Sequence, residues 1–116
     1  MTITIYHNAR CSKSRDTLAL LTEKGIAPEI VAYLDTPPDA ATLRGLLKKL
    51  RFADARSLMR KGEPEYKALN LADPSLSQHA MIDAMIANPK LIERPIVVNG
   101  NKAALGRPPE NVLTIL

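Results

Sequence analysis

Polar and apolar residues alternate at the start of the chain, over residues 2–6. This period of two, together with β-branched side chains, is typical of a strand. From residue 12 to 24 the leucines recur at helical spacing instead, and Gly25 is suited to follow a helix end. An apolar run at 28–34 predicts a second strand. The order strand–helix–strand implies a right-handed crossover between parallel strands.

The middle of the chain is predicted to be helical. The leucines between residues 43 and 50 are spaced as the buried stripe of one helix, and Thr36 or Asp39 is its candidate N-cap. Ser77 is the candidate N-cap of a later helix. Besides the leucine-rich helix, helical segments are expected at residues 53–60, 65–69 and 77–87.

The last part of the chain returns to strands. Residues 94–98 suit a buried strand, Asn99-Gly100 is a hairpin-turn signal, and residues 102–105 would form the returning strand. A final helix is expected at 110–116. We therefore predict a single α/β domain over all 116 residues, with a four-stranded mixed sheet and helices on its faces.

Composition narrows the classes of protein that these elements can form. Apolar residues make up 46% of the chain and charged residues 24%, as in ordinary globular domains. The net charge is +4, but the basic residues are scattered and aromatic residues make up only 3%, so we expect no nucleic-acid binding. Small anions match this charge better.

The cysteine count limits the redox chemistry. Cys11 is the only cysteine, so no internal disulfide can form, which fits a reducing compartment. We find no signal peptide and no segment suited to span a bilayer, so we expect a cytoplasmic protein without membrane contact. We also expect a monomer.

Cys11 lies where the first predicted strand meets the first predicted helix. The N–H groups and positive dipole end of a helix start stabilise anions, so they lower the pKa of a thiol below its usual value of about 8.5. Arg10, Lys13 and Arg15 act in the same direction. A buried, inert cysteine is the alternative, but the charged and hydroxyl neighbours argue against it. We predict a thiolate nucleophile in a site that also binds an oxyanion.

Two neighbours could help this thiol to ionise. A protonated His7 imidazole near Cys11 would stabilise the thiolate, and Ser14, three residues further on, could donate its hydroxyl. The alternatives are a solvated strand-end histidine and an ordinary serine of the first helical turn. The other histidine, His79, looks like a surface helix residue. Two distant histidines and one cysteine make a weak metal site, and we predict none.

Three arginines are candidates to bind the oxyanion, because a guanidinium group presents a planar fork of donors. Arg60 ends a short predicted helix, Arg94 directly precedes a proline, and Arg107 lies in a tight Gly-Arg-Pro loop. Solvated surface arginines are the alternative. The rigid loops at strand ends favour the convergence of Arg94 and Arg107 on one site.

The order of elements, with the cysteine after the first strand and Pro95 before the third, resembles a thioredoxin-like fold. The resemblance implies a cis bond before this proline, beside the cysteine. The sequence itself leaves both isomers open.

Five segments carry a more specific resemblance. They are Tyr-His-Asn-x-x-Cys at 6–11, Tyr-Leu-Asp-Thr-Pro-Pro at 33–38, Arg60-Lys61, Glu-Arg-Pro-Ile-Val-Val at 93–98 and Gly-Arg-Pro-Pro-Glu at 106–110. Together they resemble the glutaredoxin-coupled arsenate reductases over nearly the whole chain. Ala9 stands where that family commonly has proline. Because the chain stops at Leu116, it is most similar to a compact chromosomal branch.

The resemblance implies an arsenate reductase whose nucleophile is Cys11 and whose oxyanion site is made by the three arginines. His7 and Ser14 match positions that lower the pKa of the thiol. No bound cofactor is implied; glutathione is the co-substrate, and glutaredoxin is the partner that resolves the Cys11–glutathione mixed disulfide. The single cysteine is consistent with this scheme, because without a second cysteine an external thiol must resolve the mixed disulfide.

Two other functions remain open from the sequence. Redox-sensing transcriptional regulators that bind RNA polymerase are similar in fold, but they typically carry Cys-x-x-Cys where this chain has Cys11-Ser12-Lys13-Ser14. The other is a glutathione-linked thiol transferase that acts on a different oxyanion or on a mixed disulfide.

Overall fold

The computed structural model describes residues 2–116, and its chain divides into two compact units. The first, here called the sheet unit, runs to Thr36 and resumes from Arg94 to Leu116. The second, the helical unit, spans Pro37–Glu93. The single domain expected from the sequence stays a prediction.

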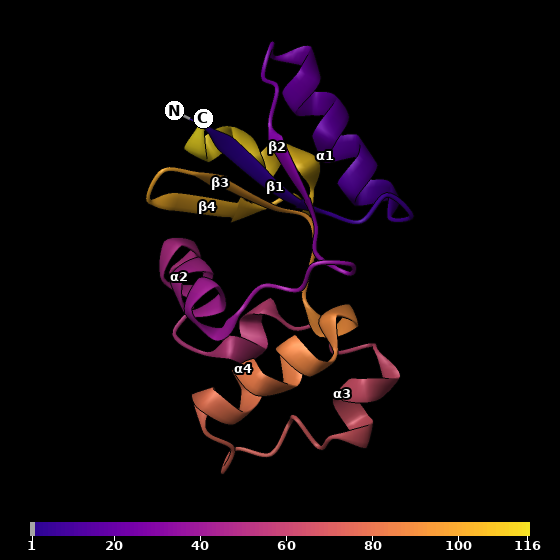
Figure 1. Ribbon diagram of the computed structural model, residues 1–116, viewed down its shortest axis with the longest axis vertical. Helices are drawn as coiled ribbons and strands as arrows, with labels where there is room; N and C mark the ends of the chain where they lie inside the picture. The colour runs from indigo at the N-terminus through magenta and orange to yellow at the C-terminus, as the bar shows by residue number, and fades with distance from the viewer. Residues whose placement is uncertain (1) are drawn as a thin grey trace. The chain divides into compact units, whose positions relative to one another are not determined.

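The sheet unit contains the four strands, in the order β2-β1-β3-β4 (Figure 1). β1 and β2 are parallel, and β3 is antiparallel to both β1 and β4. This confirms the predicted α/β architecture with a mixed four-stranded sheet. The elements of the unit are β1 (Ile3–His7), α1 (Ser12–Glu23), β2 (Glu29–Ala32), β3 (Ile96–Asn99), β4 (Lys102–Leu105) and the 3₁₀ helix η3 (Pro109–Ile115).

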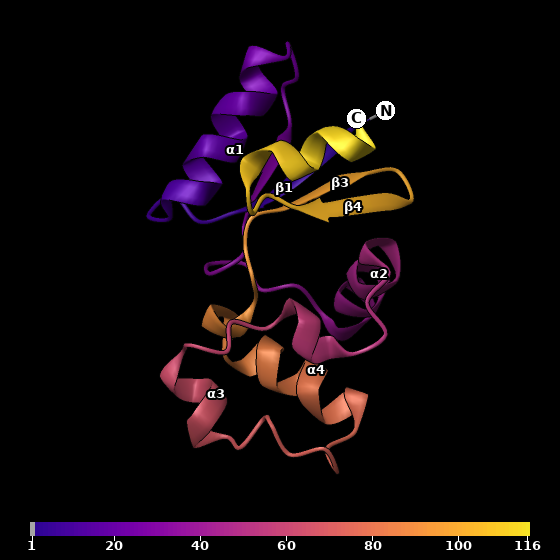
Figure 2. The ribbon, with the colours of Figure 1, turned by 180° about the vertical axis from the view of Figure 1, so that it is seen from behind.

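α1 and η3 pack against each other on one face of this sheet (Figure 2). Their fully buried residues Leu21 and Val112 meet Ile5 of β1 and Val97 of β3 in one apolar cluster. α1 ends as expected, because Gly25 adopts φ +78° just after the helix. The sequence therefore predicted the extent of α1 from its leucine spacing and from Gly25.

The last helix differs from the expectation, since residues 109–115 form a 3₁₀ helix. Its turns close with bonds three residues apart, such as Asn111 N–H to the Pro108 carbonyl at 3.0 Å. The asparagine and β-branched residues that follow Pro109 are weak α-helix formers.

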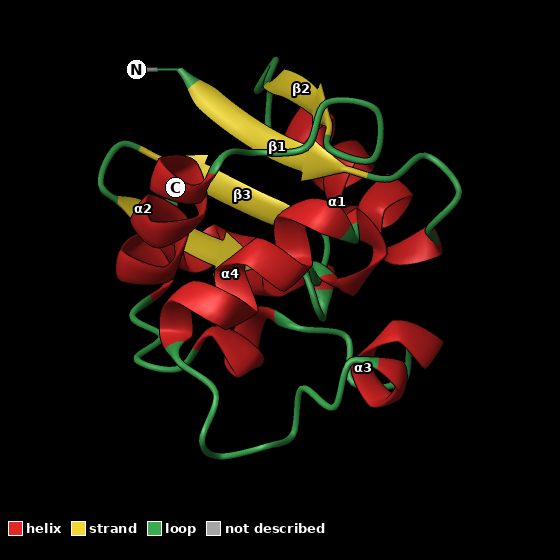
Figure 3. Cartoon of the chain, turned by 60° about the horizontal axis from the view of Figure 1, so that its bottom comes forward, coloured by secondary structure: helices red, strands yellow, loops and turns green. Residues whose placement is uncertain are grey.

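The helical unit consists of short helices (Figure 3). Asp39 and Ser77 are confirmed as N-caps, because their side chains accept hydrogen bonds from Thr42 N–H and Ala80 N–H. The segment expected at 53–60 is only a short 3₁₀ helix. The elements of the unit are α2 (Ala40–Leu50), η1 (Ala55–Leu58), α3 (Pro64–Ala68), α4 (Gln78–Ala87) and η2 (Pro89–Leu91). Within residues 2–116, no helix is long and apolar enough to cross a membrane.

Candidate active site

A tight loop joins β1 to α1 and carries Cys11 at its end. The Asn8 carbonyl accepts a hydrogen bond from the Cys11 N–H at 3.0 Å, and the Asn8 side chain accepts one from the Arg10 N–H at 3.0 Å. The Arg15 guanidinium donates to the Ala9 carbonyl at 2.9 Å. Asparagine favours such turns because its side chain bonds the backbone two residues on. These bonds hold Cys11 at the N-cap of α1.

The environment of the half-buried Cys11 sulfur favours the thiolate. Burial raises the pKa of the thiol, whereas the N–H groups of Ser14 and Lys13 at the helix start lower it. The Arg94 guanidinium lowers it further, and the resulting pKa is about 7 instead of 9.0. The thiolate is therefore far more populated at neutral pH than in an unperturbed cysteine.

Arg94 and Arg107 come from the loops at one end of the β3–β4 hairpin. Ile96 of β3 pairs with Leu105 of β4. Arg94 lies two residues before Ile96 and Arg107 two residues after Leu105, so the pairing brings the two arginines together. Nη1 of Arg107 lies 3.9 Å from the Cys11 sulfur and donates to the Arg94 carbonyl at 3.1 Å. The structure thus brings two of the three predicted arginines to the sulfur.

The backbone around these arginines has two cis peptide bonds, Arg94–Pro95 and Arg107–Pro108. The first was the candidate that the sequence left open, and the second was not anticipated. Gly106 lies between them and is buried. Its N–H donates to the Pro95 carbonyl at 3.0 Å, which joins the two arginine-bearing loops.

Gly106 and Thr17 are functional candidates that the sequence did not reveal. The fully buried Thr17 side chain donates to the Lys13 carbonyl at 2.8 Å and lies 3.4 Å from the Gly106 carbonyl. A Cβ at Gly106 would overlap Thr17 Oγ1 and lie 2.7 Å from Pro95 Cγ. α1, which carries Cys11, can therefore approach the Arg107 loop only because residue 106 has no side chain. No local pattern signals a contact between residues so distant in sequence.

Ser14 and His7 lie beside the loop, and their predicted roles in stabilising the thiolate stay predictions. Ser14 is fully buried; its hydroxyl accepts from the Asn8 N–H at 3.4 Å, and it is the backbone N–H of Ser14 that acts on the sulfur. Burial and the Arg15 charge lower the pKa of His7. This shift makes the protonated form, which the prediction invoked, harder to populate.

Arg60 belongs to the helical unit. Its guanidinium lies 2.5 Å from a Glu63 carboxylate oxygen and 3.7 Å from one of Glu93. These two carboxylates were not anticipated as its partners. The role of Arg60 in oxyanion binding stays a prediction.

A mixed sheet in the order β2-β1-β3-β4, with a cysteine of lowered pKa at the start of the first helix, defines a thioredoxin-like protein. A family model described as the ArsC family matches residues 6–115. The chain belongs to the ArsC family.

Relatives and solved structures match the chain along its length. The Escherichia coli protein YfgD, described as uncharacterized, is 64% identical and aligns over 98% of this chain and 96% of its own. An arsenate reductase of Haemophilus influenzae is 51% identical over the whole of both chains. The structure of an arsenate reductase from Vibrio cholerae matches with a TM-score of 0.98 at 52% identity, covering 100% of this chain and 98% of that one.

Proposed function

We propose that this protein is an oxidoreductase that reduces arsenate to arsenite with electrons from thiols. The proposal rests on the environment of the Cys11 thiol: its pKa is lowered to about 7, and Nη1 of Arg107 lies 3.9 Å from its sulfur. A thiolate supplies the nucleophile, and fixed guanidinium groups supply the charge that a tetrahedral oxyanion needs. The arsenate reductases among its relatives support this substrate.

In the first step the Cys11 thiolate attacks arsenic. A sulfur–arsenic bond forms, and one arsenate oxygen leaves as water after taking up protons, so arsenic remains pentavalent. Arg94 and Arg107 hold the remaining oxygens and balance the charge that moves onto them. The backbone N–H groups of the Cys11 loop add donors to the same anion. Arg60 is proposed as the third arginine that binds the oxyanion.

In the second step glutathione attacks the Cys11 sulfur of the adduct. A disulfide bond forms between the two sulfurs, the sulfur–arsenic bond breaks, and its electron pair reduces arsenic to arsenite. Each sulfur gives up one electron. The chain contains one cysteine, so an external thiol must then resolve the Cys11–glutathione disulfide. Glutaredoxin is the proposed partner, and the reducing cytoplasm is the proposed location.

A coupled assay with arsenate, glutathione and glutaredoxin tests the proposal. The wild-type protein should form arsenite continuously, and Cys11→Ser should form none, because a hydroxyl cannot replace the thiolate. Arsenite formation by Cys11→Ser would remove the nucleophile assignment. A wild-type protein that forms no arsenite but is recovered with RNA polymerase would instead support the regulator hypothesis.

A further inference from the structure

A pocket of about 400 Å³ adjoins the Cys11 loop on the side of β2. Residues 7–10 of the loop form one wall, and Ala32, Leu34 and Asp35 form the other. β1 and β2 are parallel, and His7 pairs with Ala32, so both walls begin where a strand ends. Crevices at the carboxyl ends of parallel strands are frequent ligand sites in α/β proteins.

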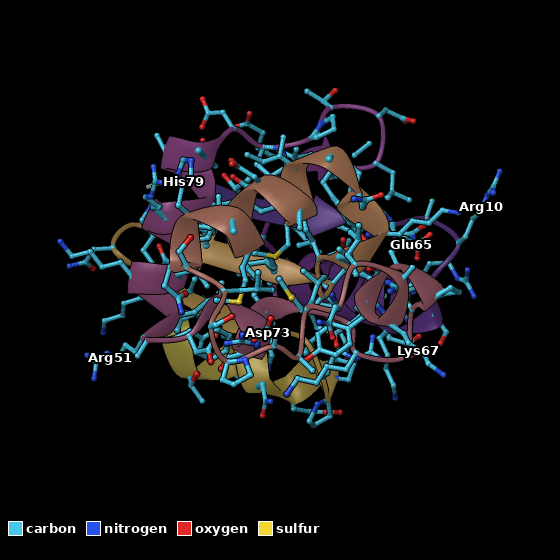
Figure 4. The ribbon with its side chains drawn as sticks, turned by 90° about the horizontal axis from the view of Figure 1, so that it is seen from below. Arg10, Arg51, Glu65, Lys67, Asp73 and His79 are labelled. Carbon is cyan, nitrogen blue, oxygen red and sulfur yellow. The ribbon has the colours of Figure 1, made fainter. Side chains whose placement is uncertain are left out.

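The walls of this pocket combine opposite charges with apolar surface. Arg10 and Asp35 are both exposed, and the Arg10 side chain extends outward from the ribbon (Figure 4). Ala9, Ala32 and Leu34 are also exposed, and Leu34 leaves 40% of its surface accessible. Such a pocket suits a small ligand that bears an anionic group, a cationic group and an apolar stem.

His7 adds a polar atom that lacks a partner. Among the residues that the structure describes, no group hydrogen-bonds to the buried Nδ1 of His7. A buried polar atom left unsatisfied is costly, and it is usually paired with water or a ligand. His7 lines the pocket, so a ligand that reaches the buried Nδ1 atom and makes one hydrogen bond to it would satisfy it.

We propose that this pocket binds the thiol co-substrate, a small zwitterionic peptide thiol such as glutathione. Arg10 binds a carboxylate of the peptide, Asp35 binds its α-ammonium group, and Leu34 packs against its apolar stem. A peptide group bonds to Nδ1 of His7. The inference rests on the proposed function, since it places the second reactant of that reaction beside the loop that carries Cys11.

The charges separate this pocket from the proposed arsenate site. The Asp35 carboxylate would repel an oxyanion, whereas it attracts an ammonium group. Arg94 and Arg107 do not line the pocket, and Arg107 lies at the sulfur instead. The two sites share the loop backbone, because the Cys11 N–H bonds to the Asn8 carbonyl. Cys11 itself does not line the pocket, so in this proposal the thiol of the bound peptide extends past the loop to reach the sulfur.

The binding test uses S-methylglutathione, which has no free thiol and cannot react. Added to the ¹⁵N-labelled wild-type protein, it should shift the amide signals of residues 8–10 and 32–35 in a saturable manner. Arg10→Gln and Asp35→Asn should each weaken this binding. Arg51→Gln is the matched control, because Arg51 is exposed, does not line the pocket and belongs to the helical unit. Its binding should equal that of the wild type.

The kinetic test compares the same variants in the coupled assay. Arg10→Gln should raise the KM for glutathione by about tenfold, the effect of one lost charge-assisted hydrogen bond, with little change in the KM for arsenate. A wild-type KM for glutathione in both pocket variants would overturn the site. Arsenate turnover without shifts at residues 8–10 and 32–35 would also overturn it, and the proposed function would stand. Shifts at these residues without turnover would support the site and contradict the proposed function.

Discussion

Cys11 occupies the N-cap of α1, a position where serine, threonine, aspartate or asparagine usually accepts N–H groups of the first turn. The sulfur takes the place of that oxygen. The Lys13 and Ser14 N–H groups face it and lower its pKa, although neither closes a short hydrogen bond to the larger atom. Ionisation of the thiol is thus favoured by the local chain geometry and reinforced by the Arg94 charge from a distant loop.

The pKa of Cys11 can be read from its alkylation rate. Because the thiolate is the reactive form, the rate with iodoacetamide should rise with pH through a midpoint of about 7 and level off above it. Arg94→Gln removes a positive charge, so its midpoint should lie higher. Arg51→Gln is the control and should keep the wild-type midpoint. A wild-type midpoint near 9, or an unchanged midpoint in Arg94→Gln, would contradict this account.

Arg94→Lys separates the charge of this residue from its shape. Lysine keeps the positive charge, so the alkylation midpoint of Cys11 should stay closer to the wild-type value than in Arg94→Gln. The planar fork that binds two oxygens is lost, so kcat/KM for arsenate should fall by about tenfold or more. Steady-state kinetics at several arsenate concentrations measures the effect. Wild-type kinetics would show that Arg94 does not bind the oxyanion.

At the scale of elements, the position of α1 depends on Gly106. The helix lies against the hairpin loop through Thr17, and a Cβ at residue 106 would overlap the Thr17 side chain. Gly106 and Thr17 are both buried, and so is the neighbouring Pro95. The side chains around residue 106 therefore have little room to move aside for a Cβ.

Gly106→Ala should destabilise the protein by about 1–3 kcal/mol, the usual cost of overpacking a buried contact. It should also lower arsenate turnover, because Arg107 is the next residue. Urea denaturation measures the free energy of unfolding. Gly45→Ala is the matched control: residue 45 lies within α2 with no atom near its missing Cβ, so alanine should stabilise by about 0.5–1 kcal/mol. Equal stability of the two variants would show that Gly106 is not a close contact.

At the scale of the whole molecule, the sequence predicted the elements better than the site. Hydrophobic spacing and capping residues are local, so they located the four strands and the caps at Asp39 and Ser77. The final segment was predicted only as a helix, and its 3₁₀ form was not anticipated.

The candidate site was only partly predictable because its contacts join distant segments. Cys11 was recognisable from its neighbours and its place before a helix, and the motifs indicated Arg94 and Arg107. The bond between the Gly106 N–H and the Pro95 carbonyl depends on how the hairpin closes, which spacing does not reveal. The lowered pKa of His7 likewise follows from burial, which only the folded chain establishes.

The sheet unit carries the nucleophile, two of the arginines and the proposed thiol pocket. Because the chain has one cysteine, the two electrons that reduce each arsenate must be supplied, overall, by external thiols. Without glutaredoxin the reaction should therefore slow sharply after one turnover, because only glutathione itself can then resolve the mixed disulfide. A burst of about one arsenite per chain should form, and the protein should accumulate as the Cys11–glutathione disulfide. Adding glutaredoxin should then restore continuous turnover.

Intact-protein mass spectrometry, with arsenite measured in the same samples, tests this most directly. Wild-type protein incubated with arsenate and glutathione should gain one glutathione on Cys11 in step with the arsenite formed, and Cys11→Ser should gain none. Arsenite formed while the wild-type protein stays unmodified, or a glutathione adduct that forms as fast without arsenate, would contradict the central role of this thiolate.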